Sequence, residues 1–477
     1  MFTPEFKEYV ATNLPQIKEK QEWGQYIHSI NYYRIKSLVP PRSKVLAIGP
    51  WVSTFLHKLD CETAVGVDPF APVIDVAYPP NIRIHSEYNG LADCREKFDY
   101  ILLSFSIGFM EDILESLLEI RRFCHEHTRL IVTYYRKLWQ PFIKLAELIG
   151  VKNKSSEMNW VPPKEIENFL QLADFQIIKD FMFCLMPLRI PFLANFINKY
   201  IANLPLIRSL GVLSMVVGRP MLNHNQGAGA RPYPLVSIVI PARNEEGNIP
   251  EIIKRIPEFP GGQEIIFVEG GSTDNTRGAI QQVMAANPGK NILFLTQDGN
   301  GKKNAVLKGF SQARGEILLI LDADMTVPPE SLLRFVEPLV QGKAEFINGS
   351  RLVYPMRGKA MRFLNLLGNI FFGKCFAYIL DQPVRDTLCG TKVLWRRDYL
   401  RMEESFRSFR GWDPFGDFDL LFGATNLNLK IVDLPVRYTE RTYGNTNIDR
   451  WRHGYILLKM VIFGLIKLKF NWLRDAD

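Results

Sequence analysis

Short runs of consecutive apolar residues alternate with helix-like stretches along most of the chain. The runs lie at residues 44–49, 64–68, 100–104 and 129–135 in the first half, and at 236–241, 264–268, 292–295 and 316–321 in the second. Runs of this length, separated by amphipathic stretches such as 112–124, are typical of parallel strands buried between helices. The sequence therefore predicts the α/β class, with two doubly wound α/β domains.

A polar stretch rich in Gly and Pro separates the two halves. It covers residues 223–234 and reads as a linker. We therefore expect one domain at 1–222, a second at 235–454 and a separate C-terminal segment at 455–477. A length of 477 residues is sufficient for two or three domains.

Composition and charge narrow the function classes. Hydrophobic residues make up 47% and charged residues 23%, which predicts ordered cores, and the net charge of +8 favours an anionic partner. Dense Lys/Arg clusters and nucleic-acid motifs are missing, so we expect no nucleic-acid partner. Six cysteines without metal-ligand spacing, and no signal peptide, predict a cytoplasmic protein with reduced thiols. No apolar stretch is long enough to predict a membrane-spanning helix.

Two aspartates follow the last apolar run. Because strand side chains alternate faces, we expect Asp322 and Asp324 to project to the same side at the carboxyl end of this strand, where open α/β sheets bind ligands. Two such carboxylates suit Mg²⁺ or Mn²⁺ shared with substrate phosphates. The alternative is a polar strand end before a helix that starts near 327–330.

Five motifs in the second half occur in the order expected of one family. They lie at 240–246, 268–274, 301–305, 322–324 and 349–351. With them, residues 235–455 resemble a family 2 glycosyltransferase of the GT-A fold, most closely the polyprenyl-phosphate sugar synthases of the dolichol-phosphate-mannose type. The resemblance implies inverting transfer from a nucleoside diphosphate sugar to a polyprenyl phosphate or another membrane-associated acceptor.

The same resemblance assigns the donor site. The implied donor-binding residues are Pro241, Arg243, Glu245, Glu269, Asp274, Lys302, Asp322 and Arg351, and the implied metal ligands are Asp322 and Asp324. Gly270 departs from the family, which commonly has a second aspartate there. A helix cap around Asp274, and solvated side chains at Lys302 and Lys303, are the alternatives.

The implied acceptor side comes from later motifs. Its residues are Arg385, Cys389 (in place of the family's serine), Arg441 and Asn447. Asn447 replaces a phosphate-binding lysine, whose charge Arg450 or Arg452 would have to restore. Asp419 is the candidate base, and Asp417 is the second choice. The two side chains would share one face if the chain is extended there. The alternative is that they form a helix cap or a polar pair at the edge of the core.

Residues 40–220 resemble a class I S-adenosylmethionine-dependent methyltransferase, on the motifs at 66–68 and 97–103. This implies S-adenosylmethionine as a cofactor, with Gly49 in its loop and Asp68 on the ribose hydroxyls. Pro50 and Trp51 replace the expected glycines, so a degenerate domain kept for regulation or docking is the alternative.

Two apolar segments contain scattered cations. Lys459, Lys467 and Lys469 interrupt 455–477, which predicts a helix lying on the inner face of the membrane, with a buried helix as the alternative. For the proline-broken segment 186–213, three roles are open: it covers the sheet edge, it docks on the other domain, or it touches the membrane. The whole chain is thus expected to be a glycosyltransferase; a bifunctional methyltransferase and a membrane-surface scaffold of inactive folds are the alternatives.

Overall fold

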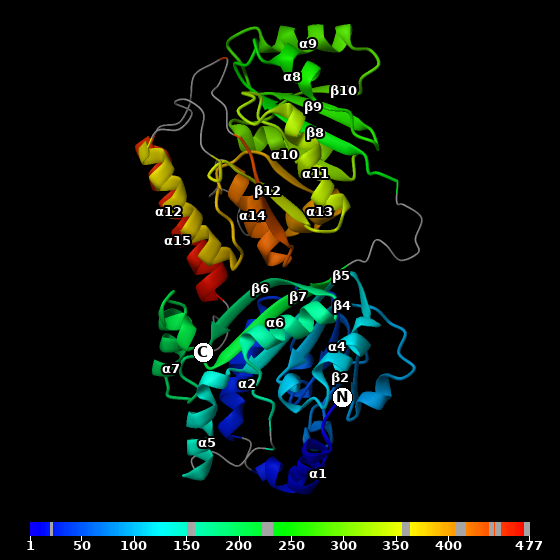
Figure 1. Cartoon of the computed structure of the whole chain (residues 1–477), viewed down its shortest axis with the longest axis vertical. Coiled ribbons are helices and arrows are strands. Elements are labelled where there is room, and N and C mark those ends of the chain that lie inside the picture. Colours follow the sequence, from blue (N-terminus) through cyan, green and yellow to red (C-terminus); the bar gives the residue numbers. More distant parts are fainter. Residues whose placement is uncertain are drawn as a thin grey trace. The chain divides into compact units, whose positions relative to one another are not determined.

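The computed structural model describes residues 1–19, 22–149, 156, 158–221, 232–354, 363–406, 416–437, 443 and 450–471. The chain divides into a first unit, Met1–Leu222 with Ile466–Asp477, and a second unit, Asn223–Leu465 (Figure 1). Each unit holds one seven-stranded, mostly parallel sheet, which confirms the predicted α/β class. Most of the predicted linker, 223–231, lies outside the described residues.

The sheet of the first unit has the order β3-β2-β1-β4-β5-β7-β6. Its strands are β1 Ser43–Ile48, β2 Cys61–Val67, β3 Ile82–His85, β4 Phe98–Ser104, β5 Cys124–Tyr135, β6 Phe175–Phe183 and β7 Leu213–Pro220. The first five strands run parallel, and β7 is antiparallel to both β5 and β6. The strand order reverses direction beside β1, which is the doubly wound arrangement.

This sheet is buried on both faces. Leu46 and Ile48 of β1 belong to one apolar core, whereas Val45 and Ala47, which point the other way, belong to a second. The continuous apolar runs of the sequence are explained by this double burial. The helices are α1 Pro4–Glu19, α2 Glu22–Lys36, α3 Ser53–Leu56, α4 Ile113–Arg121, α5 Gln140–Leu148, α6 Pro163–Leu172 and α7 Leu193–Phe196.

The sheet of the second unit has the order β10-β9-β8-β11-β13-β12-β14. Its strands are β8 Val236–Ala242, β9 Gln263–Glu269, β10 Ile292–Thr296, β11 Ile317–Ile320, β12 Phe346–Ser350, β13 Lys392–Trp395 and β14 Ile431–Pro435. Strand β13 is antiparallel to its neighbours β11 and β12. Strand β8 lies between β9 and β11. After β8 the chain continues to β9 on one side, and after β11 it continues to the strands on the other side. Open α/β sheets bind ligands at the carboxyl ends of two strands related in this way.

The helices of the second unit are α8 Ile249–Arg255, α9 Thr276–Ala286, α10 Lys302–Gln312, α11 Leu332–Val340, α12 Phe363–Leu380, α13 Arg396–Phe406, α14 Asp417–Asn426 and α15 Arg450–Gly464. In the part of the chain that the structure covers, no helix combines the length and apolar character that crossing a bilayer requires.

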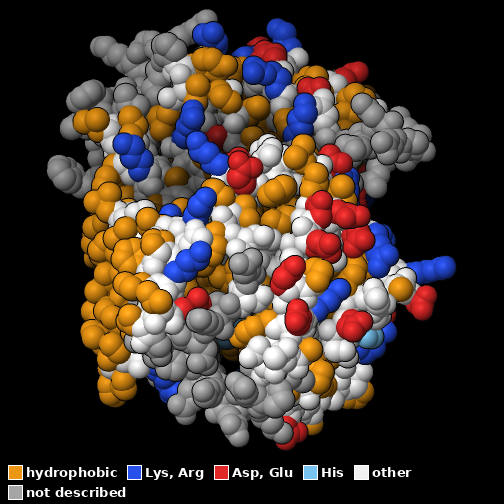
Figure 2. Space-filling model, turned by 60° about the horizontal axis from the view of Figure 1, so that its bottom comes forward, with side chains coloured by type: hydrophobic (Ala, Val, Ile, Leu, Met, Phe, Trp, Pro, Cys, Tyr) orange, Lys and Arg blue, Asp and Glu red, His pale blue; other side chains and the backbone are white. Residues whose placement is uncertain are grey.

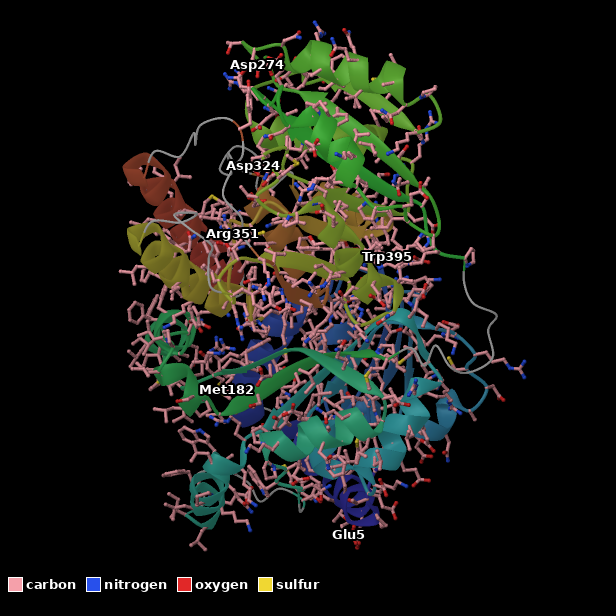
Figure 3. The ribbon with its side chains drawn as sticks, turned by 45° about the horizontal axis from the view of Figure 1, so that its top comes forward. Glu5, Met182, Asp274, Asp324, Arg351 and Trp395 are labelled. Atoms are coloured by element: carbon pink, nitrogen blue, oxygen red, sulfur yellow. The ribbon has the colours of Figure 1, made fainter. Side chains whose placement is uncertain are left out.

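Helix α15 begins at Arg450, five residues before the predicted C-terminal helix, and it has two apolar faces. Leu457, Met460 and Val461 are buried, while Tyr455 is 61% and Ile462 50% exposed. Helices α12 and α15 lie side by side in Figures 1 and 3. One side of the helix is therefore buried, as the alternative interpretation expects, whereas the contact of its exposed apolar side with a membrane stays a prediction.

The end of the chain returns to the first unit. After α15, a π-helical turn at Leu465–Phe470 contains Lys469, which is 1% exposed. The Asn203 side-chain amide donates to the Lys469 carbonyl over 3.3 Å, and the rings of Tyr200 and Phe470 lie 5.4 Å apart. The first unit thus consists of two pieces of chain that are distant in sequence.

Candidate active site

The loops after β8 and β9 are tied together by Asp274. Its Oδ1 accepts hydrogen bonds from the Thr276 backbone N–H (3.0 Å) and hydroxyl (2.5 Å), and its Oδ2 accepts from the Glu246 N–H (3.2 Å). Burial opposes ionisation, but these hydrogen bonds prevail and lower the pKa of Asp274. Asp274 therefore shapes the predicted donor loops through their backbone.

The other predicted donor residues at these strand ends lie close together. Glu269 ends β9, is 5% exposed and accepts from the Ser272 N–H over 2.5 Å. Pro241 lies opposite Val268 in the sheet, and Glu245 accepts from the Asn248 amide over 2.6 Å. Arg243 is exposed to solvent. The two strand ends thus present one edge lined by polar groups.

The aspartate pair does not lie on a strand. Because β11 ends at Ile320, strand alternation does not direct Asp322 and Asp324, and that part of the prediction is wrong. Asp322 Oδ1 lies 2.5 Å from Lys302 Nζ, whereas Asp324 Oδ1 accepts from the Thr326 N–H (3.1 Å) and hydroxyl (2.8 Å) in a tight turn. Asp274, Asp324 and Arg351 lie along one edge of the second unit in Figure 3.

Lys302 and Asp322 form a half-buried ion pair at the amino end of α10, with side chains 30% and 28% exposed. Burial acts to lower the pKa of Lys302, but the carboxylates of Asp322, Asp417 and Asp324 raise it well above its usual range. Burial likewise acts to raise the pKa of Asp322, which Lys302, together with Arg351 and Lys392, holds below its usual value. Both partners are therefore ionised at neutral pH.

Gly390 packs directly against this ion pair. A Cβ atom at this position would lie 2.0 Å from Asp322 Oδ2 and 2.2 Å from Lys302 Nζ. Only glycine leaves room for the pair, so Gly390 is a site residue that the sequence analysis missed. Its one sequence signal was its place beside Cys389 in the acceptor-side motif.

Asp417 and Asp419 are helical, so the condition under which they would share one face, an extended segment, is not met. They lie in the first turn of α14, where residues two apart point in different directions. Asp417 Oδ1 lies 3.4 Å from Lys392 Nζ, and Asp419 Oδ2 lies 2.5 Å from Lys303 Nζ. Burial raises the pKa of Asp419, although Lys303 opposes that effect. Lys302 and Lys303 thus both form ion pairs, so the alternative of solvated lysine side chains is wrong.

Asp419 and Lys303 also line a pocket of about 240 Å³ of empty space, together with apolar side chains of α10 and α14. The carboxylate at the amino end of α14 is favoured there by the helix dipole. The two candidate bases therefore have separate environments: Asp419 faces this pocket, and Asp417 faces Lys392.

Arg351 is held by a carboxylate that the sequence analysis did not identify. Its guanidinium makes a two-point contact with Asp386, at 2.7 Å from Nε and 2.8 Å from Nη2, and its own N–H donates to Asp386 Oδ2 over 3.0 Å. The two side chains are 12% and 0% exposed. The geometry fixes the fork of Arg351 rigidly. Asp386 lies next to Arg385 in the sequence, but its position gave no sign of this contact.

The predicted acceptor residues have different surroundings. The Cys389 side chain is 1% exposed and part of the core, and burial raises the pKa of its thiol to about 12, so any role of this residue is one of packing. The Arg385 side chain is exposed, while its N–H donates to Asp433 Oδ2 over 2.6 Å. Burial raises the pKa of Asp433 to about 6.

The residues predicted to bind the acceptor phosphate are not among those that the structure describes. Arg441 and Asn447 lie outside the described residues, as do the side chains of Arg450 and Arg452. In the described ranges, no three His, Cys, Asp or Glu side chains gather as a metal cluster. Mg²⁺ is usually bound by one or two protein carboxylates together with substrate phosphates and water, so the metal assignment of Asp322 and Asp324 stays a prediction.

In the first unit, Asp68 is committed to its own loop. Its carboxylate is 0% exposed and accepts from the backbone N–H groups of Trp51 (3.1 Å), Ser53 (3.0 Å) and Phe70 (2.9 Å), and from the Ser53 hydroxyl. A ribose contact would require breaking these bonds, so the predicted cofactor contact of Asp68 is not supported. The donors could not be identified from sequence because they come from two separate loops.

The neighbouring glycine position is equally crowded. A Cβ at Gly49 (φ +141°) would lie 2.0 Å from the Ser104 carbonyl oxygen. Only glycine therefore lets the backbone at this position pack so closely against the end of β4. Trp51 (φ +67°) stacks on Phe70 with ring centroids 4.7 Å apart. Trp51, one of the two residues in place of the expected glycines, therefore fills this loop with an aromatic ring.

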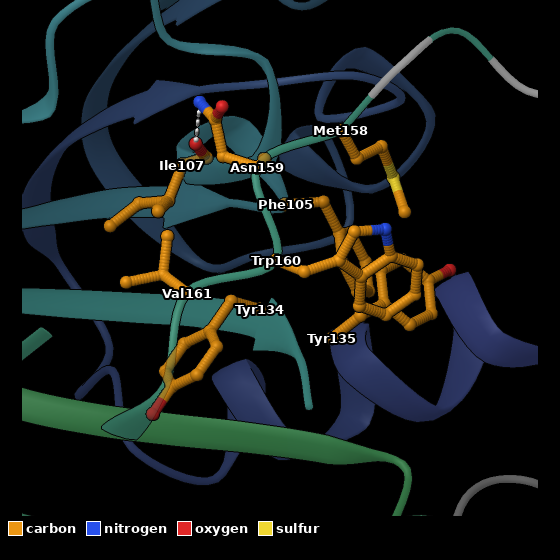
Figure 4. A pocket seen from close by; sticks show the side chains of 9 residues that line it. Phe105, Ile107, Tyr134, Tyr135, Met158, Asn159, Trp160 and Val161 are labelled. Atoms are coloured by element: carbon orange, nitrogen blue, oxygen red, sulfur yellow. Dashed lines mark hydrogen bonds between the residues drawn. The ribbon is translucent and has the colours of Figure 1, made fainter. Parts of the chain in front are cut away.

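A pocket of about 300 Å³ lies past the carboxyl ends of β4 and β5 (Figure 4). Phe105 and Tyr135 stack within it at 5.0 Å, and Trp160 lies 6.4 Å from Tyr135. The Asn159 amide donates to the carbonyls of Met110 (2.7 Å) and Ile107 (3.4 Å). The pocket is aromatic, and the amide nitrogen of Asn159 is engaged by backbone.

His28 makes the stability of the first unit sensitive to acid. It lies 5.2 Å from the Phe105 ring and 6.0 Å from the Trp51 ring, and burial lowers its pKa to about 4. The unfolded chain binds a proton near pH 6.5 and the folded chain only near pH 4, so stability falls as the pH drops through this range. We expect His28→Phe to flatten that fall in thermal unfolding curves recorded between these pH values; an unchanged slope would contradict it.

Comparisons with known proteins find similarity to glycosyltransferases. The family model described as glycosyl transferase family 2 matches residues 237–401. Glycosyltransferase AglJ of Haloferax volcanii is 30% identical over 225 residues, which cover 46% of this chain and 69% of that protein. The undecaprenyl-phosphate 4-deoxy-4-formamido-L-arabinose transferase of Pseudomonas aeruginosa is 36% identical over 118 residues, covering 24% of this chain and 35% of that protein.

Among solved structures, the glucosyl-3-phosphoglycerate synthase of Mycobacterium tuberculosis, in complex with Mn²⁺, uridine diphosphate and glucosyl-3-phosphoglycerate, is similar with a TM-score of 0.38 and 18% identity. That match covers 52% of this chain and 87% of the other.

Proposed function

The chain belongs to glycosyl transferase family 2, and from this membership we propose that its second unit transfers a sugar from a nucleoside diphosphate sugar to a polyprenyl phosphate, with inversion at the anomeric carbon. The printed name of the Pseudomonas relative specifies an undecaprenyl-phosphate acceptor, which supports this acceptor class. Another membrane-associated acceptor is the second candidate.

One observation carries the proposal. The ion pair of Asp322 with Lys302 and the turn that holds Asp324 lie in the loop after β11, next to the carboxyl end of β8, where the sheet order reverses. A diphosphate bound there faces both a carboxylate pair and the half-buried cation of Lys302. This combination suits a donor whose leaving group gains negative charge as the sugar departs.

We propose that Asp322 and Asp324 hold Mg²⁺ or Mn²⁺ together with the donor. When bound, the ion supplies Lewis-acid neutralisation of the leaving diphosphate. Lys302 then leaves Asp322 and turns to a phosphate oxygen. Arg351, fixed by Asp386, contributes a rigid positive charge, and Glu269 and Glu245 line the nucleoside side.

A membrane-associated acceptor is supported by the exposed apolar faces of α12 and α15. Phe371 is 57%, Leu367 47% and Ile370 40% exposed on α12, at helical spacing, and Tyr455 and Ile462 are exposed on α15. Apolar faces of this kind suit a helix pair lying at the lipid interface. We place the protein in the cytoplasm, peripheral to the inner face of the membrane.

Calorimetry tests the donor half of the proposal. The full-length protein is titrated with UDP-, GDP- and dTDP-sugars, each with and without Mn²⁺, and with S-adenosylmethionine; a metal-dependent heat with one nucleotide sugar supports the proposal. Transfer of a radiolabelled sugar to undecaprenyl phosphate then tests the acceptor. Silence from all nucleotide sugars favours the scaffold alternative, and heat with S-adenosylmethionine favours the bifunctional one.

Replacing Asp419 distinguishes the acceptor classes. A hydroxyl acceptor must lose a proton, so Asp419→Asn should lower kcat by about a hundred-fold or more, whereas an ionised phosphate acceptor needs no base and should lose less than about ten-fold. The measurement is kcat with each acceptor at saturating donor. A larger loss in Asp417→Asn would move the role to Asp417.

A further inference from the structure

The first unit exposes an unusual density of apolar side chains. Fourteen of the twenty-seven large apolar side chains that are exposed in the described part of the chain fall within residues 138–149 and 188–210, which we call the apolar patch. Scattered single apolar residues are normal on a protein surface, but a concentration of this kind marks an interaction site.

The most exposed members of the apolar patch are large. Phe192 is 92%, Leu206 88% and Leu148 81% exposed. Helix α5 contributes Phe142 and Leu145 as well, and none of its residues is buried, so no element in the described part of the chain covers its apolar side. Figure 2 shows apolar side chains gathered along the left edge of the surface, the side on which α5 and α7, and also α12 and α15, lie in Figure 1.

The apolar patch has an ordered framework. The Trp139 indole N–H donates to the Leu210 carbonyl over 2.9 Å, which joins the start of α5 to the end of the second segment. Asn198, fully buried, accepts from the Met186 N–H (2.9 Å) and donates to the Met186 carbonyl (2.8 Å), and its amide also donates to the Tyr26 hydroxyl (3.1 Å). The exposed side chains are therefore presented by a backbone that the core holds in place.

Charge identifies the kind of partner. Residues 136–149 and 184–210 contain six Lys or Arg residues and one acidic residue, Glu147. Lys137, Lys144 and Arg189 are exposed. Apolar side chains flanked by cations match the boundary between acyl chains and anionic headgroups. A twofold contact between two copies would instead bring like charges together.

We propose that the apolar patch docks the first unit on an anionic phospholipid membrane. Phe192 and Leu206 enter the boundary of the acyl chains, and Lys144 and Arg189 contact the phosphates. This gives the first unit a role that does not need S-adenosylmethionine. The assignment rests on the first unit alone, so it stands or falls separately from the transferase activity.

Vesicle co-sedimentation of the full-length protein tests the proposal. With vesicles of phosphatidylcholine and phosphatidylglycerol, the double substitution Phe192→Ser and Leu206→Ser should lower partitioning by about ten-fold or more, because two large apolar side chains no longer enter the lipid. The matched control is Leu118→Ser with Leu172→Ser, which changes two side chains of the same unit that are 49% and 57% exposed outside the patch. The control should bind as the original chain does.

Two further measurements distinguish this proposal from a membrane contact through α15 and from a contact between two copies of the chain. Binding that persists in the patch variant and is lost in Ile462→Ser would place the membrane contact on α15 and overturn the proposal. Sedimentation velocity without lipid covers the remaining case: a dimer that the patch variant converts to a monomer, without vesicle binding by the original chain, would assign the patch to a second copy. Weaker binding of Lys144→Glu with Arg189→Glu to the same vesicles supports the headgroup contact, and unchanged binding overturns it.

Discussion

Asp324→Asn is expected to abolish metal-dependent donor binding and to lower turnover by about a thousand-fold, because it removes half of the charge offered to the ion. Asparagine keeps an oxygen that can accept from the Thr326 N–H and hydroxyl, so the turn should survive and the loss should be one of charge. Calorimetry with the identified nucleotide sugar, with and without Mn²⁺, measures the binding, and initial rates measure kcat.

The control for this substitution is Asp298→Asn, which makes the same chemical change at a side chain that is 79% exposed and paired with Lys308. It should leave donor binding and turnover unchanged. Unaltered turnover in Asp324→Asn would remove Asp324 from the metal site, whereas a large drop in its melting temperature would show that the carboxylate holds the loop.

Gly390→Ala is expected to damage the donor site more than the fold. The new methyl group needs the space of Asp322 Oδ2 and Lys302 Nζ, and the far end of the lysine can move aside more easily than backbone can. We therefore expect a modest stability cost of about 1–3 kcal/mol. Displacing the Asp322 carboxylate should lower kcat/KM by about a hundred-fold, since small misplacements at a reacting centre are costly.

Denaturant titration and donor kinetics of the same preparation separate these two effects. Gly289→Ala is the matched control, because a Cβ there meets nothing within 4 Å. If Gly390→Ala retains full kcat/KM, the ion pair between Asp322 and Lys302 is not part of the donor site.

The sequence predicted the architecture well because continuous apolar runs reflect burial on both faces of a sheet. The α/β class and two doubly wound sheets are confirmed, and the ends of β8, β9 and β11 were identified as the places for polar residues. Local side-chain directions were less predictable. An apolar run does not show where the hydrogen-bonded ladder stops, so Asp322 was placed on a strand that ends at Ile320.

Partners distant in sequence could not be predicted from motifs. Asp386 contacts Arg351, which is 35 residues away in the sequence. Lys392, at the start of β13, lies close to Asp417, which is on α14. The methyltransferase resemblance implied a ligand contact for Asp68, but N–H groups from two loops surround its carboxylate. In each case the sequence gives the charged group, and only the fold determines its partner.

The return of the C-terminal residues to the first unit has a consequence for biosynthesis. Most of the first unit is translated before the second, yet Asn203 and Tyr200 can meet Lys469 and Phe470 only after the second unit has been translated. Domains usually mature one after another during synthesis. Here the earlier-made unit receives these packing contacts only after the later-made one, which couples its maturation to synthesis of the second unit.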